Sequence, residues 1–186
     1  YFRREYDSAV SIFNQLIQED GFSQEAKYWL ALCKWRDLKP QPAINDLENL
    51  ISEVESDEFK SKIFLSLGEI HLSIDNSELA FNNFDKGANL SKNRLLREQV
   101  YFQIAEISFQ KTDFDKALES YQKVLSNTVS ITRIQDSNLK MVQIYRLRGE
   151  LEKSANKIQE LIIDEDFSSI KSDLDLELTK IEFDRG

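Results

Sequence analysis

The sequence predicts an all-α fold built from a repeated helical hairpin. In the stretch from Tyr101 to Leu125, apolar residues recur at three- and four-residue steps, break at Lys111-Thr112-Asp113 and resume at Phe114. This pattern indicates two amphipathic helices joined by a tight turn. Five Gly and two Pro in 186 residues leave few residues for β-turns or linkers. One hairpin cannot bury both of its apolar faces, so we expect several to stack into an array.

Similar stretches follow one another along the whole chain, which predicts a single array over residues 1–186. We expect the second helix of a truncated repeat at 1–20, ended by Gly21, and the first helix of a further repeat at 168–186. Full hairpins are expected at 24–54, 58–90, 97–126 and 134–164. The turn at Lys39-Pro40-Gln41-Pro42 suits a helix start, where proline is tolerated. Asn76 or Ser77, and Asp113, are the expected caps of second helices.

A small residue marks the same place early in each second helix. These positions are Ala9, Ala43, Ala80, Ala117 and Ser154, separated by steps of 34, 37, 37 and 37 residues. Such regular spacing indicates a true repeat. Three extra residues in the later steps would lengthen helices by about 4.5 Å.

The residues at these positions resemble the tetratricopeptide repeat family, whose signature places an aromatic residue, Leu-Gly and a second aromatic on the first helix, then Ala and an aromatic on the second. The stretch Phe64-x-x-Leu67-Gly68-x-x-His71 with Ala80-x-x-x-Phe84 matches it, as does Tyr101-x-x-Ile104-Ala105 with Ala117-x-x-x-Tyr121. The resemblance implies a right-handed α-solenoid. Small residues such as Gly68 and Ala105 would let the two helices of a hairpin approach closely. The proline that often closes a repeat in this family is absent from every copy.

The resemblance also implies a concave groove, lined by first helices, that binds a peptide or helix of a partner protein. The residues expected on this inner wall are Tyr28, Leu32, Trp35, Leu65, Glu69, Phe102, Glu106, Phe109, Gln143 and Arg146. Aromatic anchors flanked by acids suit an amphipathic or basic segment. The weighed alternative is that these aromatic residues only pack between hairpins.

Other partners are disfavoured by charge and residue type. A net charge of −9 repels nucleic acid and anionic lipid, and no apolar run is long enough to enter a membrane. Some family members hold C-terminal carboxylates with Lys, Asn and Arg, but the matching positions here include Tyr28, Leu65 and Glu69. We therefore expect a protein partner, and no chaperone-tail adaptor.

No catalytic or cofactor constellation is present, so a non-enzymatic scaffold or adaptor is the expected function. His71 is the single histidine and lies at a helix-packing position, and Cys33 lies on an apolar face. Acid clusters such as Asp164-Glu165-Asp166 do not have the spacing of a calcium loop and are read as a solvated rim. The alternative is a regulatory or substrate-presenting segment of a larger enzyme or sensor.

Two further expectations concern location and ends. The junction from Gly21 to Leu30 resembles bacterial cell-envelope repeat proteins of the barrel-assembly and Tol-Pal coordinator type, without their proline, which favours the periplasm or envelope over the cytoplasm. The opening helix presents Tyr6, Val10, Phe13 and Ile17 with no preceding helix to cover them. Terminal helices of such arrays need a polar outer face. We therefore expect the native chain to continue at both ends, or the end helices to dock against another copy as a homo-oligomer.

Overall fold

The computed structural model describes residues 2–18 and 22–186, and all regular secondary structure in them is helical. This confirms the predicted all-α class. Gly21, the predicted end of the first helix, lies outside the described residues, as do the side chains of residues 1–7. In residues 2–18 and 22–186, no helix is both long enough and apolar enough to cross a membrane.

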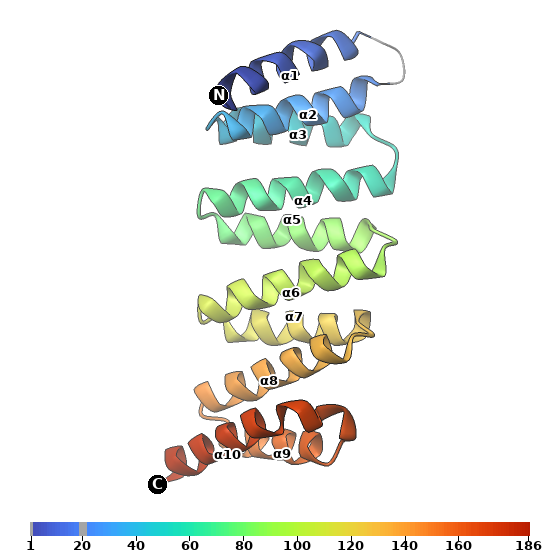
Figure 1. The fold of residues 1–186 in the computed structure, drawn as a ribbon. Coiled ribbons are helices and arrows are strands. Elements are labelled where there is room, and N and C mark those ends of the chain that lie inside the picture. Colours follow the sequence, from blue (N-terminus) through green and yellow to red (C-terminus); the bar gives the residue numbers. More distant parts are fainter. Residues whose placement is uncertain (1, 19–21) are drawn as a thin grey trace. The chain divides into compact units, whose positions relative to one another are not determined.

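The chain divides into two compact units, residues 1–92 and 93–186. In the first, α1 (Phe2–Leu16) packs on α2 (Ser23–Arg36), which forms a hairpin with α3 (Pro40–Glu53), and α4 (Asp57–Ser73) forms a hairpin with α5 (Ser77–Leu90). The second unit contains the hairpin of α6 (Arg94–Gln110) and α7 (Phe114–Asn127), followed by that of α8 (Ile131–Leu147) and α9 (Leu151–Ile162). A short 3₁₀ helix, η1 (Glu165–Ile170), then leads into α10 (Lys171–Arg185). Figure 1 shows consecutive helices running back and forth in each hairpin.

The 34-residue and 37-residue steps of the repeat differ because the first helices differ in length. Helix α2 contains 14 residues, whereas α4, α6 and α8 contain 17 each. The second helices α3, α5 and α7 all contain 14 residues. The three extra residues of each 37-residue step therefore lengthen the first helix by about 4.5 Å, close to one turn.

The same turn joins the two helices of every full hairpin. The second residue after each first helix has a positive φ: Leu38 (60°), Asp75 (57°), Thr112 (59°) and Gly149 (74°). These four residues are 37 positions apart. In the turn of α4, Asp75 N–H donates to Leu72 C=O at 3.0 Å and Asn76 N–H donates to His71 C=O at 2.9 Å. This pair of bonds is a Schellman motif, which satisfies carbonyls that a helix end leaves unpaired.

The second helices begin as predicted where the side chain after the turn can cap them. Asn76 accepts a hydrogen bond from Leu79 N–H, and Asp113 accepts one from Lys116 N–H. Proline occupies the first turn of α3, which has no side-chain cap. Each of these devices satisfies or removes a backbone donor that the helix start would leave unpaired.

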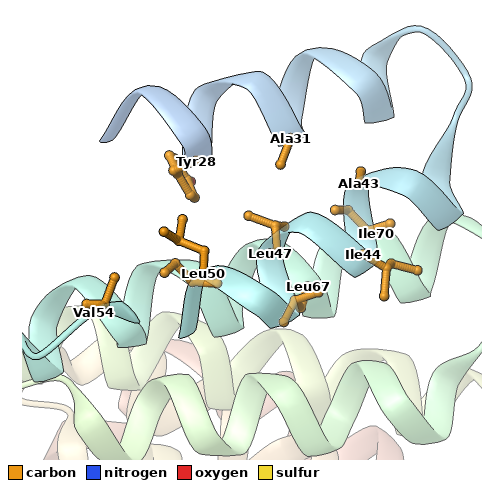
Figure 2. Packing of buried hydrophobic residues seen from close by; sticks show 10 residues of the cluster. Tyr28, Ala31, Ala43, Ile44, Leu47, Leu50, Val54, Leu67 and Ile70 are labelled. Carbon is orange, nitrogen blue, oxygen red and sulfur yellow. The ribbon is translucent and has the colours of Figure 1, made fainter. Parts of the chain in front are cut away.

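Small residues set the spacing within the hairpins. Ala43, Ala80, Ala117 and Ser154 are all completely buried. Gly68 lies against Phe84 so closely that a side chain would not fit, which agrees with the predicted close approach. Figure 2 shows the core of the first unit, where Tyr28 and Ala31 of α2 point toward Leu47 and Leu50 of α3.

Two features were not predicted from the sequence: a 3₁₀ helix before α10, and a contact between α1 and α2. Residues 165–170, part of which was read as solvated rim, form η1 and bury Phe167 at 6% exposure. The last helix begins at Lys171 and continues to Arg185. Val10 and Phe13 of α1, and Ile17 just after it, are half-buried. The ring centroid of Phe13 lies 6.5 Å from that of Trp29.

Candidate functional site

A cleft of about 440 Å³ lies in the first unit, between α2 and α4. It contains five of the ten predicted inner-wall residues, namely Tyr28, Leu32, Trp35, Leu65 and Glu69. Its remaining lining residues are Trp29, Cys33, Arg36, Lys62 and Ser66. The cleft thus has an aromatic and aliphatic wall with three charged groups at its surface.

Tyr28 forms the buried floor of this cleft. Its side chain is 4% exposed and belongs to the hydrophobic core, and its hydroxyl oxygen lies 2.8 Å from Ser66 Oγ. Burial raises the pKa of the Tyr28 phenol, and the nearby Glu69 carboxylate adds to the shift. Tyr28 is therefore neutral at physiological pH. Its contact with Ser66 joins α2 to α4.

The two tryptophans of the chain form the wall. Trp35 Nε1 donates a hydrogen bond to Ser73 Oγ at 3.1 Å, so its ring is held in one orientation. Trp29 is 42% exposed and lies edge-on to Tyr28, with ring centroids 5.2 Å apart. Large rings held in place offer contact area at little cost in conformational entropy.

Two cations lie over these rings. Lys62 Nζ is 4.5 Å from the Tyr28 ring centroid and 4.8 Å from that of Trp29. The Arg36 guanidinium is 4.6 Å from the Trp35 centroid. Sequence reasoning missed Lys62 and Trp29, because neither occupies a position that the repeat marks with a recurring residue type. Their signal is the cluster of aromatic residues on α2, which attracts cations by ring electrostatics.

In the second unit, the predicted residues of α6 make contacts within the unit. The Arg133 guanidinium lies 3.8 Å from the Phe102 ring centroid, and Lys140 Nζ lies 4.6 Å from that of Phe109. The buried Tyr121 hydroxyl donates to Glu106 Oε1 at 2.5 Å. Burial, together with Glu106, raises the pKa of Tyr121. These side chains hold α6, α7 and α8 together.

The predicted residues of α8 contact a buried carboxylate on α10. Glu177 is 2% exposed, and it accepts hydrogen bonds from Gln143 Nε2 at 3.2 Å and Arg146 Nε at 3.0 Å. Lys180 Nζ also donates to it at 2.7 Å, and Arg146 reaches Asp184. Burial alone would raise the pKa of Glu177, but hydrogen bonds from Lys180 and Arg146 hold it below its usual range.

The inner-wall positions form three series with a period of 37 residues. One is Tyr28, Leu65, Phe102, Leu139 and Leu176, the second is Leu32, Glu69, Glu106, Gln143 and Lys180, and the third is Trp35, Leu72, Phe109, Arg146 and Phe183. On α10, Leu176 is 54% exposed and Phe183 is 85% exposed. Helix α10 therefore continues the register of the first helices.

His71 is buried, as the sequence predicts, whereas Cys33 is half-buried and lines the cleft. His71 is 5% exposed, and burial lowers its pKa although Glu48 opposes the shift. Burial raises the pKa of the Cys33 thiol, which disfavours the nucleophilic thiolate. Within the described residues, no three His, Cys, Asp or Glu side chains are grouped as a metal site requires.

Comparison with curated proteins gives one related sequence. PIH1 domain-containing protein 1 of Xenopus laevis is 27% identical to this chain over 142 residues, covering 68% of this chain and 46% of the relative. The chain thus spans about half the length of that protein.

Several solved structures are similar to most of the chain. The C-terminal part of a TPR repeat-containing protein from Cytophaga hutchinsonii is 21% identical, with a TM-score of 0.58 and coverage of 86% of this chain and 60% of that one. The MamA protein is 15% identical, with a TM-score of 0.60 and coverage of 92% and 87%. A TPR repeats protein from Bacteroides fragilis is 14% identical, with a TM-score of 0.52 and coverage of 96% and 80%. At these identities the similarity shows the fold alone.

A family model described as "Tetratricopeptide repeat" matches residues 98–127. This segment contains most of the α6–α7 hairpin, including the Tyr101, Ala105, Ala117 and Tyr121 positions of the predicted repeat. The family model and the similar solved structures agree with the resemblance on which the sequence prediction rested. Residues 98–127 therefore form a tetratricopeptide repeat, and the chain has the fold of tetratricopeptide-repeat proteins.

Proposed function

We propose that this chain is a non-enzymatic protein-interaction module whose cleft between α2 and α4 binds a peptide or helix of a partner protein. The observation that carries the proposal is the gathering of Tyr28, Trp29 and Trp35 around one cleft of about 440 Å³. Binding energy at protein interfaces concentrates on large aromatic and arginine side chains in concave sites. The helical-hairpin fold supports this function, because stacked hairpins commonly serve as binding surfaces.

The cleft is a better candidate than the inner wall of the second unit. There, Glu106 is hydrogen-bonded to Tyr121, and Arg146 is paired with Glu177. A partner would first have to break these contacts, at a cost in desolvated charge. We therefore assign Glu106, Gln143 and Arg146 a stabilising role and place partner contact on the first unit.

The chemistry of the cleft favours binding over catalysis. Its thiol, Cys33, has a raised pKa, and the buried His71 is not among the residues that line the cleft. Nucleophilic catalysis needs a nucleophile within hydrogen-bond reach of a base. The lining residues Tyr28 and Ser66 are within hydrogen-bond reach, but burial raises the pKa of the Tyr28 phenol, so the phenolate that would act as the base is disfavoured. Binding is therefore the function that we assign to the lining residues.

The test is affinity capture from the source organism followed by mass spectrometry. The parent chain is compared with a cleft variant carrying Trp29→Ala and Trp35→Ala, and with Leu79→Ala, which removes an exposed apolar side chain from α5. Circular dichroism and thermal unfolding establish that all three chains fold. A partner retained by the parent and Leu79→Ala but lost by the cleft variant supports the proposal. Equal capture by all three folded chains rules out the cleft as the binding site.

A further inference from the structure

The two cations of the cleft differ from the other basic residues of α2. Lys27 is paired with Glu53 and Lys34 with Asp46, each at 2.5 Å. Arg36, on the same helix, lies over the Trp35 ring and forms no ion pair with a described carboxylate. The basic side chains of α2 that point toward α3 are therefore neutralised, whereas the one in the cleft is available.

Lys62 provides the second available cation, from α4. Its ammonium lies over Tyr28 and Trp29 and, within the described part of the chain, pairs with no carboxylate. The cleft has one acidic residue, Glu69. It is thus a locally cationic surface in a chain of net charge −9.

The two cations lie over different tryptophans. Lys62 is near Trp29 and Arg36 is near Trp35, and these tryptophans are six positions apart on α2, which corresponds to about 9 Å along the helix axis. A segment in the extended polyproline-II conformation presents every third residue on one face, about 9 Å apart. Two acidic side chains three positions apart would therefore match the axial spacing of the two tryptophans. The apolar side chains between them would lie on the adjoining faces of the segment, where the cleft offers Leu32 and Leu65.

We propose that this cleft recognises an acidic, extended segment of a partner protein that carries a large apolar residue between two carboxylates. The inference rests on the proposed function, since it names the chemistry of the partner for the same cleft. The expected partner was an amphipathic or basic segment, because acids were expected in the groove. The structure favours an acidic one, because Glu106 is hydrogen-bonded to Tyr121 and Glu69 shares the cleft with two cations. Glu69 is left to accept a hydrogen bond from a backbone N–H of the bound segment.

The two tryptophans allow a direct binding measurement. Trp29 and Trp35 are the only tryptophans in the sequence, and both line the cleft, so their fluorescence reports on its occupancy. The probes are a blocked peptide, Gly-Glu-Leu-Phe-Glu-Gly, and a matched peptide with Lys in place of both Glu residues. We expect the Glu peptide to change the emission and to bind about tenfold tighter than the Lys peptide. Added salt should weaken the binding.

Charge reversal completes the test. Arg36→Glu with Lys62→Glu should reverse the preference between the two peptides. The control, Lys92→Glu with Lys171→Glu, makes the same change in net charge at exposed positions outside the cleft and should keep the parent preference. Tighter binding of the Lys peptide by the parent, or no effect of the cleft reversal, overturns the acidic specificity and leaves the proposed function standing. If neither peptide binds by fluorescence or calorimetry, the cleft as a peptide site is refuted as well.

Discussion

The ring of Phe84 occupies the space directly facing Gly68. A β-carbon added at Gly68 would lie 2.5 Å from two carbons of that ring, which is inside van der Waals contact. Phe84 is 2% exposed, so its ring is enclosed by the core. The glycine therefore fixes the distance between α4 and α5.

Gly68→Ala should destabilise the first unit by about 1–3 kcal/mol, because a side chain at this position overpacks a dense core. Denaturant unfolding followed by tryptophan fluorescence measures the effect, since both tryptophans belong to this unit. Adding Phe84→Leu to the variant relieves the contact and should recover part of the loss. If the effects of the two substitutions on the free energy of unfolding simply add, the contact between residue 68 and the Phe84 ring is not the cause of the destabilisation.

The hairpin turns give a second prediction. Thr112 has a φ of 59° and Gly149 a φ of 74° at equivalent places in two Schellman motifs. A residue with a β-carbon costs about 1–2 kcal/mol in this left-handed region, and glycine avoids the cost. Thr112→Gly should therefore stabilise the second unit by about 1 kcal/mol, and Gly149→Ala should destabilise it by a similar amount.

Thermal unfolding by circular dichroism measures both turn variants. Lys111→Gly is the matched control, because Lys111 has a φ of −84° and gains nothing from the freedom of glycine. That control should be neutral or destabilising. Stabilisation by Lys111→Gly equal to that by Thr112→Gly would show that left-handed strain is not the cause.

The hairpins could be predicted from sequence because they depend on local, periodic information. The 37-residue register of Ala43, Ala80 and Ala117 defines where helices pack, and capping residues such as Asn76 and Asp113 define where they begin. Half of the predicted inner-wall residues line the cleft for the same reason. A helix face follows from spacing alone.

The remaining site features depend on interactions that spacing does not encode. Lys62 reaches Trp29 and Tyr28 through a long, flexible side chain, and its direction is decided by the neighbouring helix. The role of Glu177 had a weak signal, because this acid occupies the apolar periodic position between Leu174 and Ile181. An acid on a buried face requires a partner, but nothing in the sequence indicates that Arg146 supplies it.

The contact between Tyr28 and Ser66 gives a third prediction. Both residues are buried, and their hydroxyl oxygens are 2.8 Å apart. Tyr28→Phe and Ser66→Ala should each cost about 1 kcal/mol, because each leaves the other hydroxyl buried without this partner. The double variant should cost less than the two single variants together. Fluorescence-monitored unfolding in urea measures the cycle, and strict additivity would mean that the two hydroxyls do not interact.

Glu177 gives the fourth prediction. It is 2% exposed and paired with Arg146 and Lys180, so Glu177→Gln removes the buried carboxylate charge that both cations face and leaves Arg146 paired with Asp184 alone. Breaking a buried ion pair from one side costs about 3 kcal/mol. We expect this loss of unfolding free energy at pH 7 by circular dichroism. Glu182→Gln, at an exposed position of the same helix, is the control and should be nearly neutral.

The pH dependence of this loss separates ion pairing from packing. The pKa of Glu177 is lowered from its ordinary value of 4.5, so the folded chain holds the proton less tightly than the unfolded chain does. Its stabilising contribution is therefore fully present above pH 4.5 and is lost as the pH falls through the lowered pKa. The difference in unfolding free energy between the parent chain and Glu177→Gln should stay constant from pH 8 to 5 and narrow below pH 4.5. A difference that persists unchanged below that pH would mean that the carboxylate acts by its shape and hydrogen bonds, with no contribution from its charge.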